Sequence, residues 1–214
     1  MSRKTELINV FHEIKSHWEN TEKKIKEINE DYTYSEEYKK EWTEDALKKL
    51  LPVVQAYHDR ALDIINSAMN ELSNKWRRNG IGRLSDGGYQ AGLSNVIKML
   101  EMGAIVERTD VEDIIAMYSE DSNAMAAIRQ ILVNCDNRIL RDCILLIPED
   151  HREKNKELLE RLKGNVDQYI NVNLVCTILD SWKFNYGLSG VLLSIDGMEQ
   201  FVKDRLDNNL ELLH

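Results

Sequence analysis

Apolar and aromatic residues recur at alternating steps of four and three along the first thirty residues or so. They are Leu7, Phe11, Ile14, Trp18, Ile25, Ile28 and Tyr32, and the polar Thr21 occupies the remaining position. This heptad spacing keeps one seam of a helix facing a partner helix once the two supercoil, whereas an ordinary amphipathic helix has a wider apolar stripe. The pattern therefore predicts a coiled-coil helix that needs a partner.

A second helix is predicted directly after Tyr32–Ser35. Ser35 can cap its first turn, where Glu36 and Glu37 supply the negative charge that a helix N-terminus favours. Pro52 is expected to bend this helix because proline removes one helical hydrogen bond. The seam continues to about Asn79 through Leu47, Leu50, Val54, Tyr57, Ala61, Ile64, Ala68 and Leu72, and fails at Lys75. Residues 1–79 are thus predicted to form a coiled-coil helical-hairpin arm.

The heptads allow two pairings, and the sequence leaves both open. In a hairpin, Leu7–Ile28 would lie against Leu47–Leu72, with Tyr32–Ser35 at the far tip. Alternatively, the first helix extends away from the second and meets its copy in another subunit. The residues expected at this interface are Leu7, Phe11, Ile14, Trp18, Ile25, Ile28, Trp42 and Trp76.

Glycines mark the end of the arm. Four of the ten glycines fall between Gly80 and Gly88, and glycine releases the backbone into conformations that other residues avoid. A phosphate-binding loop would need a GxxxxGK motif after a strand, and both the lysine and the strand are missing. Residues 80–88 are therefore predicted to be a hinge, followed by an acidic helical body over residues 89–214.

The first half of the body alternates short apolar faces with helix boundaries. Gly103 is expected to end one helix as a left-handed cap. Thr109–Glu112 has the TxxE form of a capping box, and Asp121 or Ser122 can cap the helix after it. The predicted faces are Tyr89–Leu100, Val111–Tyr118, Met125–Leu132 and Ile139–Ile147.

The second half contains longer apolar stretches. A helix that begins after Pro148 and carries Leu158, Leu159 and Leu162 is expected to end at Gly164. Residues 166–186 are the least charged part and are predicted to form a central buried helix that includes Ile178, Leu179 and Trp182. A last helix is expected from about Ser189, after an interruption at Gly187 and Gly190. The charged tail, residues 207–214, is expected to fray.

Composition narrows the fold class to all-α. Two prolines and ten glycines are few for 214 residues, and turns between strands consume both types. Cys135, Cys143 and Cys176 form an odd set without a CxxC pair, which indicates the reducing cytoplasm rather than a disulfide framework. No apolar run approaches the ~18 residues of a membrane span. We expect a cytoplasmic or virion-associated protein that is not embedded in a membrane.

Charge makes nucleic acid an unlikely partner. The formal net charge is −9, and nearly all of the acidic excess lies in residues 80–214, because the arm carries almost equal numbers of both signs. An acidic body repels phosphate backbones.

The side chains suggest no reaction. His12 and His17 are five residues apart, so they differ by roughly 140° around a helix and cannot share a metal as the HExxH pair does. The chain has neither an ExxH motif nor a GxSxG elbow, and the cysteines lie in apolar surroundings. We therefore assign no catalytic, metal or cofactor site and expect a protein that is not an enzyme.

Several segments resemble a known group of proteins. Asn95–Leu100, Asp110–Ile114 and Ser122–Arg129 resemble helices of small proteins encoded among the head and capsid genes of tailed bacteriophages and prophages of Gram-positive bacteria. Asn123 stands where that group usually has proline, and the likeness covers about residues 1–135. The resemblance implies a structural or assembly factor. Together with the heptad arm, it leads us to expect a protein that forms homo-oligomers and docks on another phage structural protein.

A second hypothesis belongs to a different functional class. Some phage-encoded inhibitors are small, acidic and helical, so the chain is alternatively a regulatory module that binds one host or phage protein through the arm or the body. The two hypotheses differ in stoichiometry and in the identity of the partner.

Overall fold

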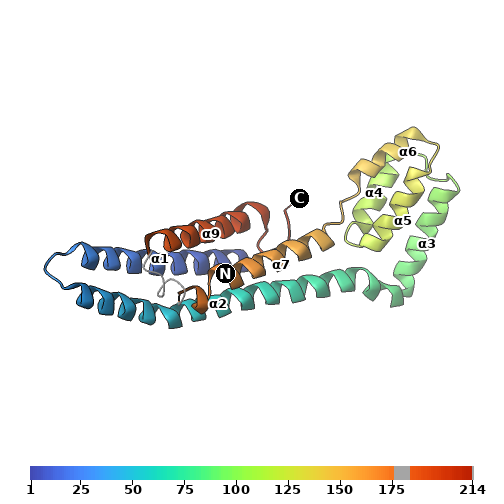
Figure 1. Cartoon of the computed structure of the whole chain (residues 1–214). Coiled ribbons are helices and arrows are strands. Elements are labelled where there is room, and N and C mark those ends of the chain that lie inside the picture. Colours follow the sequence, from blue (N-terminus) through green and yellow to red (C-terminus); the bar gives the residue numbers. More distant parts are fainter. Residues whose placement is uncertain (176–183, 214) are drawn as a thin grey trace. The chain divides into compact units, whose positions relative to one another are not determined.

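The protein is all-α, as predicted. The computed structural model describes residues 1–175 and 184–213, and no strand occurs within them apart from an isolated bridge between Leu206 and Leu212. The predicted buried residues Ile178, Leu179 and Trp182 lie outside the described residues. Figure 1 shows the helices α1 (Arg3–Glu30), α2 (Glu36–Asn79), α3 (Gly87–Glu101), α4 (Arg108–Tyr118), α5 (Ser122–Val133), α6 (Arg138–Asp142), α7 (Arg152–Tyr169) and α9 (Phe184–Arg205).

The chain divides into two compact units at boundaries that differ from the predicted arm and body. Unit 1 comprises Met1–Asn70 together with Lys154–His214, and unit 2 comprises Glu71–Glu153. The predicted division placed everything after residue 88 in one body. The C-terminal helix α9 packs on α1, so residues 154–214 group with the hairpin in unit 1.

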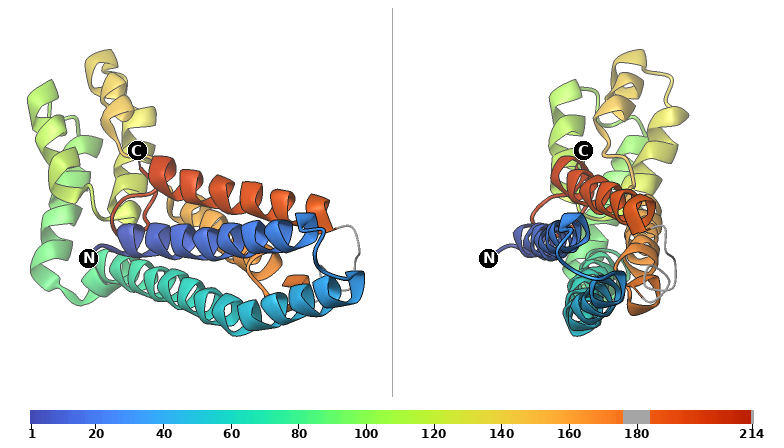
Figure 2. Two further views of the ribbon diagram at one scale, coloured as in Figure 1. Left: turned by 90° about the vertical axis from the view of Figure 1, so that its left-hand side faces the viewer. Right: turned by 60° about the vertical axis from the view of Figure 1, so that its left-hand side comes forward.

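In unit 1, α1 folds back on α2 of the same chain, which is the hairpin pairing of the two that the heptads allow. Ser35 caps α2 as predicted, since its Oγ accepts a hydrogen bond from the N–H of Tyr38 at 3.2 Å. Arg60 on α2 lies 3.3 Å from a carboxylate oxygen of Glu6 on α1. The helix α2 continues through Pro52 as one element, and Figure 2 shows that it is curved.

The buried stripe of the hairpin is broader than a two-helix seam. Val10 is fully buried in addition to the heptad residues Leu7, Phe11 and Ile14. Likewise, Ile65 is buried on α2 beside the predicted seam. A seam between two helices does not cover such neighbouring positions, so further helices must pack on this part of the hairpin.

The helix α9 supplies much of that cover. It lies alongside α1 in both views of Figure 2, and these two helices share the most extensive close approach among the described elements. Lys15 on α1 donates a hydrogen bond to Asp196 on α9 at 2.5 Å. The ammonium group of Lys4 donates to the carbonyl oxygens of Lys203 and Leu206, both at 2.7 Å. This places a positive charge at the C-terminal end of α9, where the helix dipole favours it.

The C-terminal tail does not fray, contrary to expectation. Asp207 accepts hydrogen bonds through Oδ1 from the backbone N–H groups of Asn209 and Glu211, both at 2.8 Å, and these bonds turn the chain back. Leu210, at a φ of 66°, is then fully buried. The N–H of Leu212 donates to the side-chain oxygen of the buried Asn155 on α7. We call residues 207–213 the C-terminal hook.

Three glycines predicted to end or interrupt helices lie inside them. The helix α7 runs past Gly164 to Tyr169, and α9 runs from Phe184 through Gly187 and Gly190. A glycine in a helix costs only about 1 kcal/mol relative to alanine. Burial of Leu162, Val166, Val191 and Ile195 on the same helices outweighs that cost. The predicted central helix over 166–186 is interrupted, since α7 ends at Tyr169, and residues 176–183 of that prediction lie outside the described residues.

Unit 2 packs α3 to α6 around one apolar core. Its buried side chains include Val111, Ile115, Ile128 and Leu132, all on predicted faces. Gly103 has the expected left-handed conformation, with a φ of 65°. The predicted hinge contains a short 3-10 helix, η1 (Ile81–Ser85), and a second, η2 (Cys143–Leu146), follows α6.

Two details of unit 2 were predicted incorrectly. The helix α4 begins at Arg108 rather than behind a Thr109 cap, and its N-cap residue, Glu107, makes no side-chain capping bond. In addition, the stretch over Ile139–Ile147 is only partly core, because Ile139, Leu145 and Leu146 are exposed. The physical reason is length: α6 has five residues and η2 has four, so these short elements cannot turn every apolar residue inward.

Truncating the chain after Leu206 tests the C-terminal hook. Loss of the buried Leu210 and Leu212 should lower the free energy of unfolding of unit 1 by about 2–4 kcal/mol, after allowance for the chain entropy released. Urea denaturation followed by tryptophan fluorescence measures the change. Leu213→Ser, which changes an exposed side chain and keeps the backbone, is the control and should change stability by less than about 0.5 kcal/mol. Equal stability of the truncated chain and the control would show that the tail is frayed after all.

Candidate functional site

Most of the predicted interface residues lie inside unit 1. Leu7, Phe11, Ile14, Trp18 and Ile25 are buried by helices of the same chain. Ile28 and Trp42 are half-buried near the hairpin turn, and Trp76 is half-buried in unit 2. Their role in association between chains stays a prediction. Among the described residues, the Nε1 group of Trp18 is buried without a hydrogen-bond partner.

The hairpin turn presents aromatic side chains to solvent. Tyr32 is 98% exposed, and Tyr34 and Tyr38 are 40% and 44% exposed. The rings of Tyr34 and Tyr38 stack with centroids 4.8 Å apart. Tyr32 was predicted to belong to the heptad seam, but α1 ends at Glu30, so the seam stops before this residue. The turn is a candidate interaction site because tyrosine is enriched where proteins bind each other.

The side chain of Asp31 fixes the turn. Its Oδ1 accepts hydrogen bonds from the N–H of Thr33 at 2.8 Å and from the Thr33 hydroxyl at 2.6 Å. These bonds hold the pKa of the Asp31 carboxyl below its usual value. The turn is therefore held in one conformation by an ionised carboxylate.

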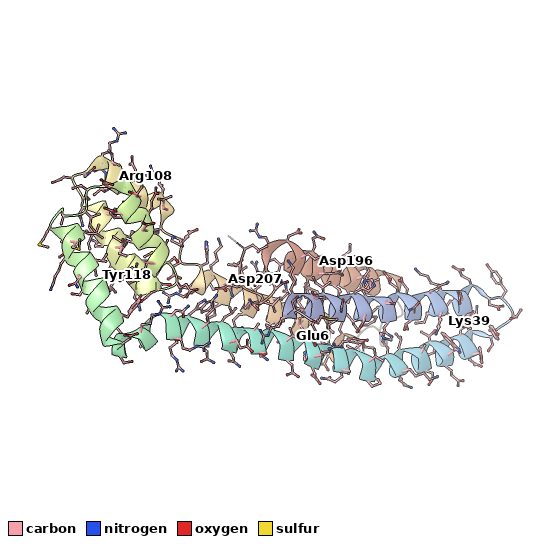
Figure 3. All side chains as sticks on the ribbon, turned by 180° about the vertical axis from the view of Figure 1, so that it is seen from behind. Glu6, Lys39, Arg108, Tyr118, Asp196 and Asp207 are labelled. Carbon is pink, nitrogen blue, oxygen red and sulfur yellow. The ribbon has the colours of Figure 1, made fainter. Side chains whose placement is uncertain are left out.

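The electrostatics of the turn are negative. The last turn of α1 contains no basic residue, although the carbonyl groups at a helix C-terminus favour positive charge. Residues 27–41 contain six carboxylates and two lysines. One of these lysines, Lys39, is buried and pairs with Glu36 at 3.1 Å; Figure 3 shows it beside the turn.

A shallow cavity of about 260 Å³ opens between α1 and α2. Small residues create it, because Thr21 and Ala46 stand where larger apolar side chains would fill the seam. The hydroxyl of Thr21 donates to the carbonyl oxygen of His17 at 2.8 Å. The lining residues are His17, Thr21, Lys24, Trp42, Asp45, Ala46, Lys49, Leu50 and Val53.

His58 joins two helices of unit 1. Its Nδ1 lies 3.0 Å from Asp59 and its Nε2 lies 3.0 Å from Asp167 on α7. Only the protonated imidazole donates from both nitrogens, so the charged form satisfies both carboxylates. The hydrogen bond from His58 lowers the pKa of Asp59. The sequence suggested no role for His58, and its partner Asp167 is 109 residues away.

A second polar cluster lies in unit 2 and stabilises the fold. Asp121 is buried and caps α5, accepting from the N–H groups of Asn123 and Ala124. The hydroxyl of Tyr89 donates to the same carboxylate at 2.9 Å, and burial raises the pKa of Tyr89. Arg83 stacks over the Tyr89 ring at 5.0 Å. Because every member has a partner, the cluster fixes the entry to α5.

One end of unit 2 exposes apolar side chains. Residues 102–107 join the end of α3 to the start of α4. The helix α5 runs antiparallel to α4, so the end of α5 lies beside the start of α4. The start of α6 follows there, at the same end of the unit (Figure 1). We call this the apolar end of unit 2. Its exposed residues are Met99, Met102, Val106, Val133 and Ile139.

The histidines, cysteines and carboxylates considered for catalysis or metal binding do not form a cluster among the described residues. Within residues 1–175 and 184–213, no three histidine, cysteine, aspartate or glutamate side chains are placed to hold a metal ion together. His12 and His17 are both exposed on α1. Cys143 is buried, which raises the pKa of its thiol, and Cys135 is half-buried. Cys176 lies outside the described residues.

Comparison with protein-family models, with curated proteins and with solved structures gives no match. Over the part of the chain that the structure describes, no helix is both long enough and apolar enough to cross a bilayer.

Replacing Thr33 with valine tests how the turn is held. The variant removes one of the two hydrogen bonds to Asp31, so the pKa of Asp31 should rise toward 3.8, and NMR titration of the side-chain carboxyl measures it. Because the folded pKa lies below the unfolded one, ionised Asp31 stabilises the turn above about pH 4, and this contribution is lost as the pH falls through the folded pKa. Asp59 in the same spectrum is the control. An unchanged Asp31 titration would contradict the assignment.

Proposed function

We propose that this protein is a non-enzymatic structural or assembly protein of a phage or prophage particle, acting in head morphogenesis or at the capsid. It works by contacting other proteins, including copies of itself. The resemblance of residues 1–135 to products of phage head genes supports the biological setting, and the surfaces of the two units support the mode of action.

The observation that carries the proposal is that each unit has its own accessible surface rich in apolar or aromatic residues. Unit 1 exposes tyrosines at the hairpin turn, and unit 2 exposes methionine and aliphatic side chains at its apolar end. Both residue classes are typical of protein interfaces. A chain with two such surfaces can join two partners, which is what an assembly factor has to do.

The burial of α1 within its own chain indicates how copies of this protein would associate. Five heptad residues of α1 are buried within the chain, so the fold of unit 1 is not expected to depend on a second copy; they are Leu7, Phe11, Ile14, Trp18 and Ile25. Association is therefore expected through exposed residues rather than by exchange of α1 between chains. Self-association then depends on concentration without loss of helical structure.

Replacing Met102 and Val106 with glutamate tests the apolar end of unit 2. Both side chains are largely exposed, so the variant should stay folded but lose association with itself or with the head proteins encoded beside it. Light scattering behind a sizing column and co-purification with portal, protease and capsid proteins measure the loss. The control is Leu193→Glu, which places a charge at an equally exposed apolar position on α9.

A wild-type chain that remains monomeric at tens of micromolar and binds none of the head proteins would overturn the proposal. Capture of a single host protein in a one-to-one complex, without any head protein, would instead favour the inhibitor hypothesis.

A further inference from the structure

We infer that the hairpin turn of unit 1 binds an arginine-rich basic segment of a partner protein. The inference rests on the proposed function and adds to it the chemistry of one partner. It is argued from three properties of the turn: its excess of carboxylates over lysines, its exposed tyrosines and its fixed conformation.

Carboxylates outnumber lysines six to two in residues 27–41, although Glu27 pairs with Lys23 at 4.0 Å and Glu36 pairs with Lys39 at 3.1 Å. Glu27 and Glu30 lie at the C-terminal end of α1, where the helix dipole is itself negative, so they add to the field instead of offsetting it. The side chain of Glu36 is 86% exposed although it pairs with Lys39. A cationic segment placed here gains from carboxylates and helix dipole together, and this complementarity selects a basic partner over an acidic or neutral one.

The exposed rings favour arginine over lysine. A guanidinium is planar and weakly hydrated and stacks on tyrosine faces, whereas an ammonium is a strongly hydrated point charge. Tyr34 and Tyr38 already stack on each other, so they present a preformed aromatic surface beside the carboxylates. Arg83 stacks on Tyr89 in this way within unit 2.

The turn is ready to bind before a partner arrives. Asp31 holds Thr33 through two hydrogen bonds, and Ser35 caps the first turn of α2. A fixed surface binds more tightly than a loop that must first be ordered, because less conformational entropy is lost.

Titration with labelled nona-arginine, followed by fluorescence anisotropy on the full chain at low salt, tests the inference. Replacing Glu30 and Glu37 with glutamine should weaken binding about five-fold, since two exposed ion pairs are lost. Replacing Tyr34 and Tyr38 with serine should weaken it about three- to ten-fold. Nona-lysine should bind the wild type several-fold more weakly than nona-arginine does. The serine variant should bind the two peptides equally, because the rings that favour arginine are gone.

The matched control is Glu157→Gln with Glu160→Gln, which removes the same charge from an exposed face of α7. It should bind nona-arginine within two-fold of the wild type. Circular dichroism checks that every variant is folded. Equal weakening by the α7 control, or wild-type binding by both turn variants, would overturn the inference, because the peptide would then be responding to net charge alone.

The inference and the proposed function fail in different ways. If head proteins bind this protein but nona-arginine does not bind at the turn, only the inference is refuted. Site-specific binding of nona-arginine at the turn, without association with any head protein, would support the inference and refute the proposed function.

Discussion

The structure of unit 1 depends on burying the broad apolar stripe of α1. Leu7, Val10, Phe11 and Ile14 point to more than one neighbour, and α2 alone cannot cover all of them. Packing of α9 against α1 completes the cover, and the Lys15–Asp196 ion pair fixes the contact. Each fully buried large apolar side chain contributes about 1.5–3 kcal/mol, far more than a surface ion pair, so the ion pair sets register while burial supplies stability.

This packing determines which residues are left for function. With its heptad residues buried inside the chain, α1 has little apolar surface to offer a second copy. The turn is one accessible part of unit 1, where α1 ends at Glu30 and the exposed tyrosines begin. In unit 2, the apolar end lies where α3 and α5 end and where α4 and α6 begin. Both accessible surfaces therefore follow from the places where regular packing stops.

The sequence predicted features that depend on neighbouring residues. The Ser35 cap, the Gly103 cap and the Asp121 cap act within a few residues, and all three are confirmed. Long-range packing could not be derived: Lys15 and Asp196 are 181 residues apart, and no local pattern pairs them. The same reason explains the errors at Gly164 and in the C-terminal hook, where tertiary burial outweighs local preference. The sequence did not identify the tyrosines of the hairpin turn as a candidate site, because Tyr32 continues the heptad spacing. In the structure α1 ends before Tyr32, so this residue is exposed instead of lying in the seam.

The central claim is that α1 is buried by its own chain. Amide hydrogen exchange of the full chain, measured at a dilute and at a hundred-fold higher concentration, tests it most directly. If the claim is right, residues 7–18 are strongly protected at both concentrations, because α2 and α9 cover them in every molecule. Protection of residues 7–18 that appears only at the higher concentration would contradict it, since α1 would then be buried by a second copy.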